Sequence, residues 1–371
     1  MPVVERGRSL PFSQSQCWIS IKLAASPQPR YWGAFDFPKI EGNERMRRLG
    51  LRGLQLGLLG AVLMHLAVTP CSGSVRVESV SFPTNVVEGT TNDHPVDLKA
   101  KLFLPEHTRR PLPAVVITPS SGGIDEVREI HYAKALSQSG IAALVIDSFG
   151  SRGVTDSIYD QRLVETWDSE NDAMAGLLWL LEDDRFDADR IGVLGVSKGG
   201  SAALDTALDI RREWMGIDDV SFAAHIAISP DCTWINRSTR TSGAPIFFML
   251  AERDDQTPAD ACIDYADRLR KGGNSAIKVK VYEDAHHAWE EIGDEPEFDA
   301  SVENYRNCRV WVEDDGSMVS ADTGRRIPER SWHRWAKRNC MKLGAHCCGG
   351  TEELREEATR DIINFLRQSG F

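Results

Sequence analysis

A serine between glycines, placed where a strand-like run meets a helix-like run, constrains this chain most. Residues 191–201 read I-G-V-L-G-V-S-K-G-G-S, in which an apolar run stops at Ser197 and small residues follow. This is the pattern G-x-S-x-G in a strand-turn-helix setting, which holds the serine hydroxyl at the carboxyl edge of a sheet. The glycines are needed because strand and helix pass close together at such a turn. The segment predicts a nucleophilic serine, and the alternative is a glycine-rich turn without chemistry.

Strand-like and helix-like stretches alternate on both sides of this segment. We expect an outer antiparallel pair at 75–82 and 96–104, followed by buried strands that alternate with helices. The buried strands are expected at 113–117, 142–146, 191–196, 222–228, 245–250 and 277–282, with helices at 126–139, 163–181, 259–271 and 352–366. This order predicts an α/β fold in which helices cover both faces of a mostly parallel, twisted sheet. Ligands bind such sheets beyond the carboxyl ends of the strands.

The length and charge of the chain narrow the class of protein. The 371 residues are enough to bury a full core in one catalytic domain with a tail at either end. There are 43 Lys and Arg against 55 Asp and Glu, which gives a net charge of −12. Because nucleic-acid backbones attract positively charged proteins, we expect no nucleic-acid partner.

The N-terminal region has the composition of an export signal. A basic start at Met46 leads into an apolar run at 51–68 and then into small residues at 69–74. We interpret residues 46–74 as a secretory signal peptide, because the apolar run is shorter than the roughly 20 residues that span a bilayer. Residues 1–45 are then a disordered upstream extension, with translation starting at Met46. Export to the periplasm or the medium is expected, without a stable membrane span once the signal is cleaved.

The cysteines fit an oxidising compartment. Cys71 at the end of the signal is a possible lipid-attachment site, but Pro70 replaces the small residue usual before it. Six cysteines follow the signal, an even number that is typical of disulfides in exported proteins. They are Cys232, Cys262, Cys308, Cys340, Cys347 and Cys348. A zinc site from the last three with His346 is the alternative, and it is disfavoured because no C-x-x-C spacing occurs.

A nucleophilic serine needs a base and a group that orients the base. His286 and His287 follow the last expected strand, the position late in the chain where a histidine could serve as the base. Asp254 and Asp255 follow the strand before it, where a carboxylate would fix the imidazole tautomer. Composition alone does not choose within either pair, and a surface histidine pair and a helix-capping aspartate are the alternatives.

The developing oxyanion needs two hydrogen-bond donors that are already in place. One is the backbone N–H of Lys198, the residue after the nucleophile. The loop at 118–123 follows the first buried strand and should supply the other, for which we favour Ser121. No metal or organic cofactor is expected for this chemistry.

Several of these segments together resemble the dienelactone hydrolase family of α/β-hydrolases, particularly its exported bacterial members. The resemblance runs from about Val96 to the C-terminus. It depends on S-G-G at 121–123, D-S-F-G-S-R-G at 147–153, D-R-I-G-V-L-G-V-S-K-G-G at 189–200, E-R-D-D-Q-T-P-A-D-A-C at 252–262 and D-A-H-H-A-W at 284–289. It implies an α/β-hydrolase fold for residues 75–371.

The resemblance also implies particular residues. The acid of the family stands four residues before a proline, which indicates Asp254. Its histidine precedes a small and then an aromatic residue, which indicates His287 ahead of Trp289. Exported members often carry cysteines at the positions of Cys232 and Cys262, which implies that these two form a disulfide.

Two candidates for substrate binding lie in the resembling segments. Trp289 follows the catalytic histidine, and Arg152 could hold a substrate carboxylate as a bidentate pair. A structural salt bridge is the alternative role for Arg152.

The sequence departs from the family at two places. The founding members carry a cysteine nucleophile, so Ser197 argues for ordinary ester chemistry. The oxyanion loop usually begins with His-Gly, whereas this chain has Pro119 and Ser120, and proline supplies no N–H. A cysteine-containing insertion at about 290–350 is expected to form a wall or lid of the pocket, or a disulfide-pinned surface excursion.

The function expected is that of an exported serine hydrolase that cleaves a small-molecule ester or lactone through an acyl-enzyme. Ser197, His287 and Asp254 form its triad, and Lys198 and Ser121 form its oxyanion site. A non-catalytic binding protein is one alternative, suggested by Pro119-Ser120. An acyltransferase with the same triad is another.

Overall fold

The computed structural model describes residues 75–84, 96–106, 111–293 and 295–371. The expected upstream extension, the signal peptide and Cys71 all lie outside these ranges. Within the described ranges, no helix combines the length and the apolar character needed to cross a membrane.

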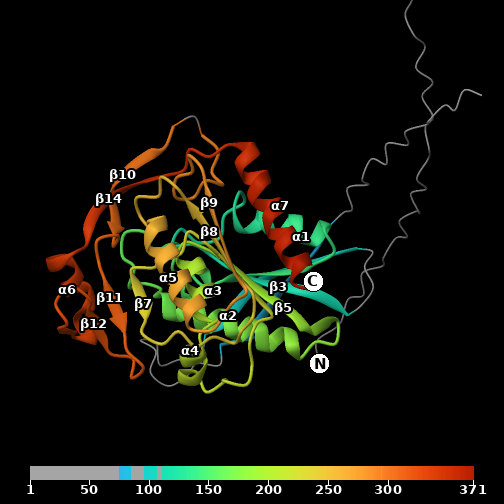
Figure 1. Cartoon of the computed structure of the whole chain (residues 1–371). Coiled ribbons are helices and arrows are strands. Elements are labelled where there is room, and N and C mark those ends of the chain that lie inside the picture. Colours follow the sequence, from blue (N-terminus) through green and yellow to red (C-terminus); the bar gives the residue numbers. More distant parts are fainter. Residues whose placement is uncertain (1–74, 85–95, 107–110, 294) are drawn as a thin grey trace, which may run out of the picture. The chain divides into compact units, whose positions relative to one another are not determined.

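An eight-stranded sheet forms the centre of the described residues, with the strand order β1-β2-β4-β3-β5-β6-β8-β9 (Figure 1). Its strands are β1 (Arg76–Pro83), β2 (Asp97–Leu104), β3 (Leu112–Thr118), β4 (Ala142–Asp147), β5 (Phe186–Val196), β6 (Ala224–Ile228), β8 (Ile246–Ala251) and β9 (Ile277–Tyr282). β1 and β2 are antiparallel, and β2 is antiparallel to β4, whereas all pairs from β4 to β9 are parallel. The expected sheet of an α/β-hydrolase is confirmed.

Helices cover both faces of the sheet because the parallel strands are apolar on both sides. Alternate residues of a strand point to opposite faces, so that Val115 packs toward one core and Val116 toward the other. Helices α1 (Glu129–Gln138) and α7 (Glu352–Gln368) pack on the first face. Helices α2 (Thr166–Leu181), α3 (Lys198–Asp205) and α5 (Ala259–Lys271) pack on the second, and the short α4 (Asp209–Trp214) follows α3.

The insertion after β9 builds two small sheets next to the loops that follow β6. One sheet pairs β10 (Glu297–Asn304) with β14 (Lys342–Cys347). The other has the order β13-β12-β11-β7, in which β7 (Trp234–Asn236) comes from the loop after β6. Its other strands are β11 (Val310–Val312), β12 (Met318–Ser320) and β13 (Arg326–Ile327). Helix α6 (Trp332–Asn339) follows β13 in the insertion.

Three disulfides occur in the described residues. Cys232 is bonded to Cys262, Cys308 to Cys340, and Cys347 to its neighbour Cys348. The first joins the loop after β6 to α5, and the second closes the insertion. The zinc alternative therefore fails, since a cysteine in a disulfide offers no thiolate to a metal.

We expect the double substitution Cys232→Ser and Cys262→Ser to lower the free energy of unfolding by about 2–4 kcal/mol, because the unfolded chain regains the freedom of the closed loop. The bond spans 30 residues, and both cysteines are buried. Urea unfolding of the oxidised protein measures the effect. An unchanged midpoint and slope would show that the bond contributes nothing to stability.

Candidate active site

Ser197 lies at a sharp turn between β5 and α3. Its backbone has φ 56° and ψ −116°, in a region that residues other than glycine rarely adopt. The Ser197 N–H donates to the carbonyl of Ile228 on the neighbouring strand at 2.8 Å, which holds the strained turn against the sheet. The hydroxyl therefore projects from the carboxyl edge of the sheet.

The two glycines of the motif allow this turn to pack. A Cβ at Gly195 would lie 2.0 Å from the carbonyl oxygen of Gly199. A Cβ at Gly199 would lie 2.3 Å from the carbonyl oxygen of Thr118 on β3. Because both obstacles are backbone atoms, no side-chain rearrangement could relieve them.

Ser197, His287 and Asp254 are brought together from the ends of β5, β9 and β8. The Ser197 Oγ lies 2.9 Å from His287 Nε2, and His287 Nδ1 lies 2.8 Å from Asp254 Oδ2. The histidine and the aspartate are only 6% and 7% exposed. These two contacts have the distances expected between a nucleophile and its base, and between the base and an orienting acid.

The neighbouring candidates have other environments. Asp255 accepts hydrogen bonds from the backbone N–H of His346 and lies 2.8 Å from its Nδ1, so it is held by the insertion. The Nδ1 atom of His286 is buried without a hydrogen-bond partner in the described residues. The choices between Asp254 and Asp255 and between His286 and His287 thus follow from orientation and not from residue type.

Thr257 is a member of this group that the sequence analysis missed. Its hydroxyl lies 2.8 Å from Asp254 Oδ2, and its N–H donates to Asp254 Oδ1 at 2.8 Å. The N–H of Gln256 donates to the same oxygen at 2.9 Å. The turn before Pro258 thereby stabilises the carboxylate, and a threonine just ahead of that proline was the available signal.

Burial and charge act in opposite directions on the pKa of each partner. Burial lowers the pKa of His287, but the attraction and hydrogen bond of Asp254 outweigh it, so that the net pKa is raised above 6.5. Burial raises the pKa of Asp254, but His287 and the hydrogen bonds from Thr257 outweigh it, and the net pKa is lowered below 3.8. The carboxylate is therefore ionised across the physiological range.

We expect kcat/KM to rise with pH through an apparent pKa above 6.5. The protonated imidazole cannot accept the serine proton, and the raised pKa of His287 extends this inactive form toward neutral pH. The profile is measured on the free enzyme with a substrate that does not titrate. A rising limb centred well below 6.5 would contradict the assignment of His287 as the base.

Two backbone donors in the wall of the cavity at Ser197 have no acceptor within the described part of the chain. They are the N–H groups of Ser121 and Lys198, and both residues line the same cavity as the serine. Pro119 has no N–H, and the N–H of Ser120 is taken by the buried carboxylate of Glu129 at 3.0 Å. Ser121 is thus the first residue of that loop with a free donor.

Two expected substrate contacts are wrong. Arg152 makes a bidentate pair with Asp172 at 2.7 and 2.9 Å, so its guanidinium is already occupied by a carboxylate of the protein itself. Trp289 is fully buried and packs on Tyr282, with ring centroids 5.1 Å apart. Neither side chain lines the cavity. Arg152 has the alternative role, a structural salt bridge, and Trp289 belongs to the core.

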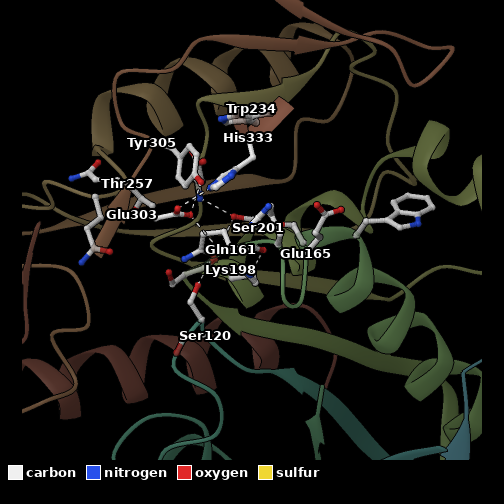
Figure 2. Close-up of a pocket in the computed structure, with 18 of the residues that line it drawn as sticks. Ser120, Gln161, Glu165, Lys198, Ser201, Trp234, Thr257, Glu303, Tyr305 and His333 are labelled. Carbon is white, nitrogen blue, oxygen red and sulfur yellow. Dashed lines mark hydrogen bonds and ion pairs between the residues drawn. The ribbon is translucent and has the colours of Figure 1, made fainter. Parts of the chain in front are cut away.

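The cavity at Ser197 has a volume of about 1610 Å³. Residues of the insertion form part of the wall of this cavity, as one of the two expectations has it. The insertion also contains the disulfide between Cys308 and Cys340. Figure 2 shows Trp234 from β7 near Tyr305 and His333 from the insertion, above Ser201. The cavity therefore combines aromatic and charged surfaces.

One group in the described residues could hold a metal ion. Asp160, Glu303 and His333 each bring a ligand atom within 4.8 Å of the others. Their present partners are within the protein: Glu303 accepts from Tyr305 at 2.7 Å and lies 2.8 Å from His333 Nε2, while Asp160 pairs with Arg162. Arg162 and Lys337, whose Nζ lies 3.4 Å from Glu303 Oε1, balance the charges of the two carboxylates.

One family model and one curated relative match part of this chain. The model of the "Dienelactone hydrolase family" matches residues 98–314, more than half of the chain. A curated relative, "Probable 2-oxo-3-(5-oxofuran-2-ylidene)propanoate lactonase" of Bradyrhizobium sp, is 26% identical over 192 residues, which cover 48% of this chain and 74% of the relative.

Solved structures are similar at low identity. A putative dienelactone hydrolase from Klebsiella pneumoniae is 18% identical, with a TM-score of 0.46, over 58% of this chain and 89% of that one. An alpha-beta serine hydrolase homologue from Coxiella burnetii is 17% identical, with a TM-score of 0.41, over 57% of this chain and 88% of that one.

Proposed function

The chain belongs to the dienelactone hydrolase family, and from this premise we propose that it is a serine hydrolase that cleaves a carboxylic ester or lactone through an acyl-enzyme. The observation that carries the proposal is the contact sequence from Ser197 Oγ to His287 and on to Asp254, at 2.9 and 2.8 Å. The alternative roles, a surface histidine and a helix-capping aspartate, do not explain why these two side chains line up with a serine in a strained turn.

The reaction proceeds in two halves. Ser197 Oγ attacks the carbonyl carbon while His287 Nε2 takes the hydroxyl proton, and Asp254 stabilises the imidazolium that forms. The N–H groups of Lys198 and Ser121 hold the tetrahedral oxyanion. His287 then gives the proton to the leaving alkoxide, and the C–O bond breaks. Water, deprotonated by His287, attacks the acyl-enzyme and releases the acid and Ser197.

Open-chain esters and lactones are both compatible with this chemistry. In a lactone the leaving alkoxide stays attached to the acyl group, so the same steps open the ring. The lactonase named among the relatives supports including lactones. The serine nucleophile and the large cavity support testing ordinary esters first.

A fluorophosphonate probe and a substrate panel test the proposal. We expect the probe to label the folded wild-type protein at Ser197, and p-nitrophenyl esters and small lactones to be hydrolysed. Folded protein that neither labels nor hydrolyses would instead support the binding-protein alternative. Products that carry the acyl group on an added alcohol, in place of the free acid, would support the acyltransferase.

We further propose that residues 75–371 act as one exported catalytic domain, with the insertion at about 290–350 as the wall of its cavity. The three disulfides support an oxidising compartment. Mass spectrometry of the native protein tests the export signal: the mature N-terminus should lie near residue 75. Peptides from residues 1–45 in the native protein would contradict the start at Met46.

A further inference from the structure

Lys198, the residue after the proposed nucleophile, has a buried side chain. Lys198 is 7% exposed, and its Nζ has three oxygen partners: Ser157 Oγ at 2.8 Å, the carbonyl of Gln161 at 3.2 Å and the carbonyl of Val164. In its protonated form the amine has three donors, so each donor has one acceptor. Burial lowers the pKa of Lys198 to about 7, so the ammonium form predominates below neutral pH. Burying a charge in this way is costly unless such partners are present.

All three acceptors belong to one segment without helix or strand, residues 157–164, which we call the bridging segment. It lies between the 3-10 turn η1 (Gly150–Arg152) and α2. Figure 2 shows Lys198 beside Gln161 of this segment in the cavity wall. Because the segment lacks the regular backbone hydrogen bonds of a helix or strand, its position depends on contacts such as these.

The bridging segment also holds the loop that carries the second oxyanion donor. The N–H of Ser157 donates to the carbonyl of Ser121 at 2.8 Å, and the Ser121 hydroxyl donates to Gln161 Oε1 at 3.1 Å. On its other side the segment meets the insertion, where the N–H of Gln161 donates to Glu303 Oε2 at 3.3 Å. Lys198 is thus linked to Ser121 through two consecutive sets of hydrogen bonds.

We propose that the side chain of Lys198 is a positioning residue that, through the bridging segment, fixes the N–H of Ser121 relative to Ser197. This inference rests on the proposed serine-hydrolase function. Lys198 then serves the oxyanion twice: its backbone N–H is one donor, and its ammonium sets the place of the other.

The inference predicts an effect on the transition state and not on substrate binding. A misplaced oxyanion donor weakens a contact that forms fully only when charge develops on the carbonyl oxygen. The expected signature is a lower kcat with little change in KM. A residue that merely stabilises the fold would lower the unfolding midpoint and leave the kinetics of the folded enzyme unchanged.

Lys198→Met is the direct test, because methionine keeps an unbranched apolar stem and removes the ammonium. With an ester that the wild type hydrolyses, we expect kcat to fall by about 10- to 100-fold, less than the 10²- to 10³-fold of losing a donor outright. KM should stay within about twofold. The Ki of a trifluoromethyl ketone, whose adduct with the serine places an oxyanion in the same site, should rise by the same factor as kcat falls.

Lys134→Met is the matched control, because Lys134 is an exposed lysine on α1 paired with Glu126. It should leave kcat and Ki unchanged. Ser157→Ala removes only one of the three acceptors of Lys198 and should lower kcat by about fivefold. If Lys198→Met does not fold, Ser157→Ala decides alone.

Folded Lys198→Met with kcat and Ki within twofold of the wild type would overturn the inference, as would an unchanged Ser157→Ala where the first variant fails to fold. Wild-type protein without hydrolysis or probe labelling is a different result. It would remove the proposed function itself.

Discussion

Ser197→Ala should lower kcat for ester hydrolysis by about 10⁶-fold, the effect of losing a nucleophile that acts as a unit with its base. The alanine leaves His287 without the oxygen that lies 2.9 Å from its Nε2, so that no acyl-enzyme can form. What remains is the slower attack of water in a site that still holds an oxyanion. Steady-state hydrolysis and fluorophosphonate labelling measure the two consequences.

Ser79→Ala provides the matched control, since Ser79 is an exposed serine on β1. It should keep full activity and full labelling. If Ser197→Ala retained most of the wild-type activity while folded, the hydrolysis would come from another group, and the triad proposal would fail.

The next largest effect is expected for Asp254→Asn, about 10⁴-fold in kcat, because a neutral amide neither fixes the required imidazole tautomer nor stabilises the imidazolium. The substitution keeps the size of the side chain, so the turn to Thr257 can stay in place. The pH profile gives a second readout. Since Asp254 is what raises the pKa of His287, the rising limb of kcat/KM should move to lower pH.

Asp255→Asn is the control for this prediction. Asp255 is the adjacent carboxylate, but its partner is His346 of the insertion and not His287. We expect kcat within about threefold of the wild type, the scale of one hydrogen bond. A larger loss in Asp255→Asn than in Asp254→Asn would reverse the assignment of the acid.

The linkage of His287 to stability has the opposite sign to its linkage to activity. Its pKa is raised in the folded state, so the pair with Asp254 stabilises the fold fully below the unfolded pKa, and this contribution is lost as the pH rises through the folded pKa. Activity requires the neutral imidazole and appears over that same rise. The site is therefore most active in the range where this pair contributes less to folding.

The errors of the sequence analysis have a common origin. The chemistry of Arg152 suits a substrate carboxylate, and nothing local in the sequence indicates that Asp172 meets it at 2.7 and 2.9 Å. Trp289 stands two residues after His287, but its side chain is buried and its ring packs on Tyr282 in the core. Both cases concern where a side chain points.

The amino-acid sequence by itself determined the alternation of strands and helices, the two-sided burial of the parallel strands and the turn at Gly195 and Gly199. These features depend on local periodicity and on backbone space, which neighbouring residues define. Composition alone left the pairs Asp254/Asp255 and His286/His287 open, and the resemblance to a family indicated Asp254 and His287 within them.

Only the tertiary structure decided which polar atoms meet. Lys198 finds its three acceptors 34 to 41 positions earlier in the chain, and His287 Nε2 reaches an oxygen 90 positions away. Such contacts depend on the packing of whole strands and helices, since a rotation of one side chain moves a donor by more than the length of a hydrogen bond. Short-range patterns therefore define the scaffold, and long-range packing defines the chemistry that it supports.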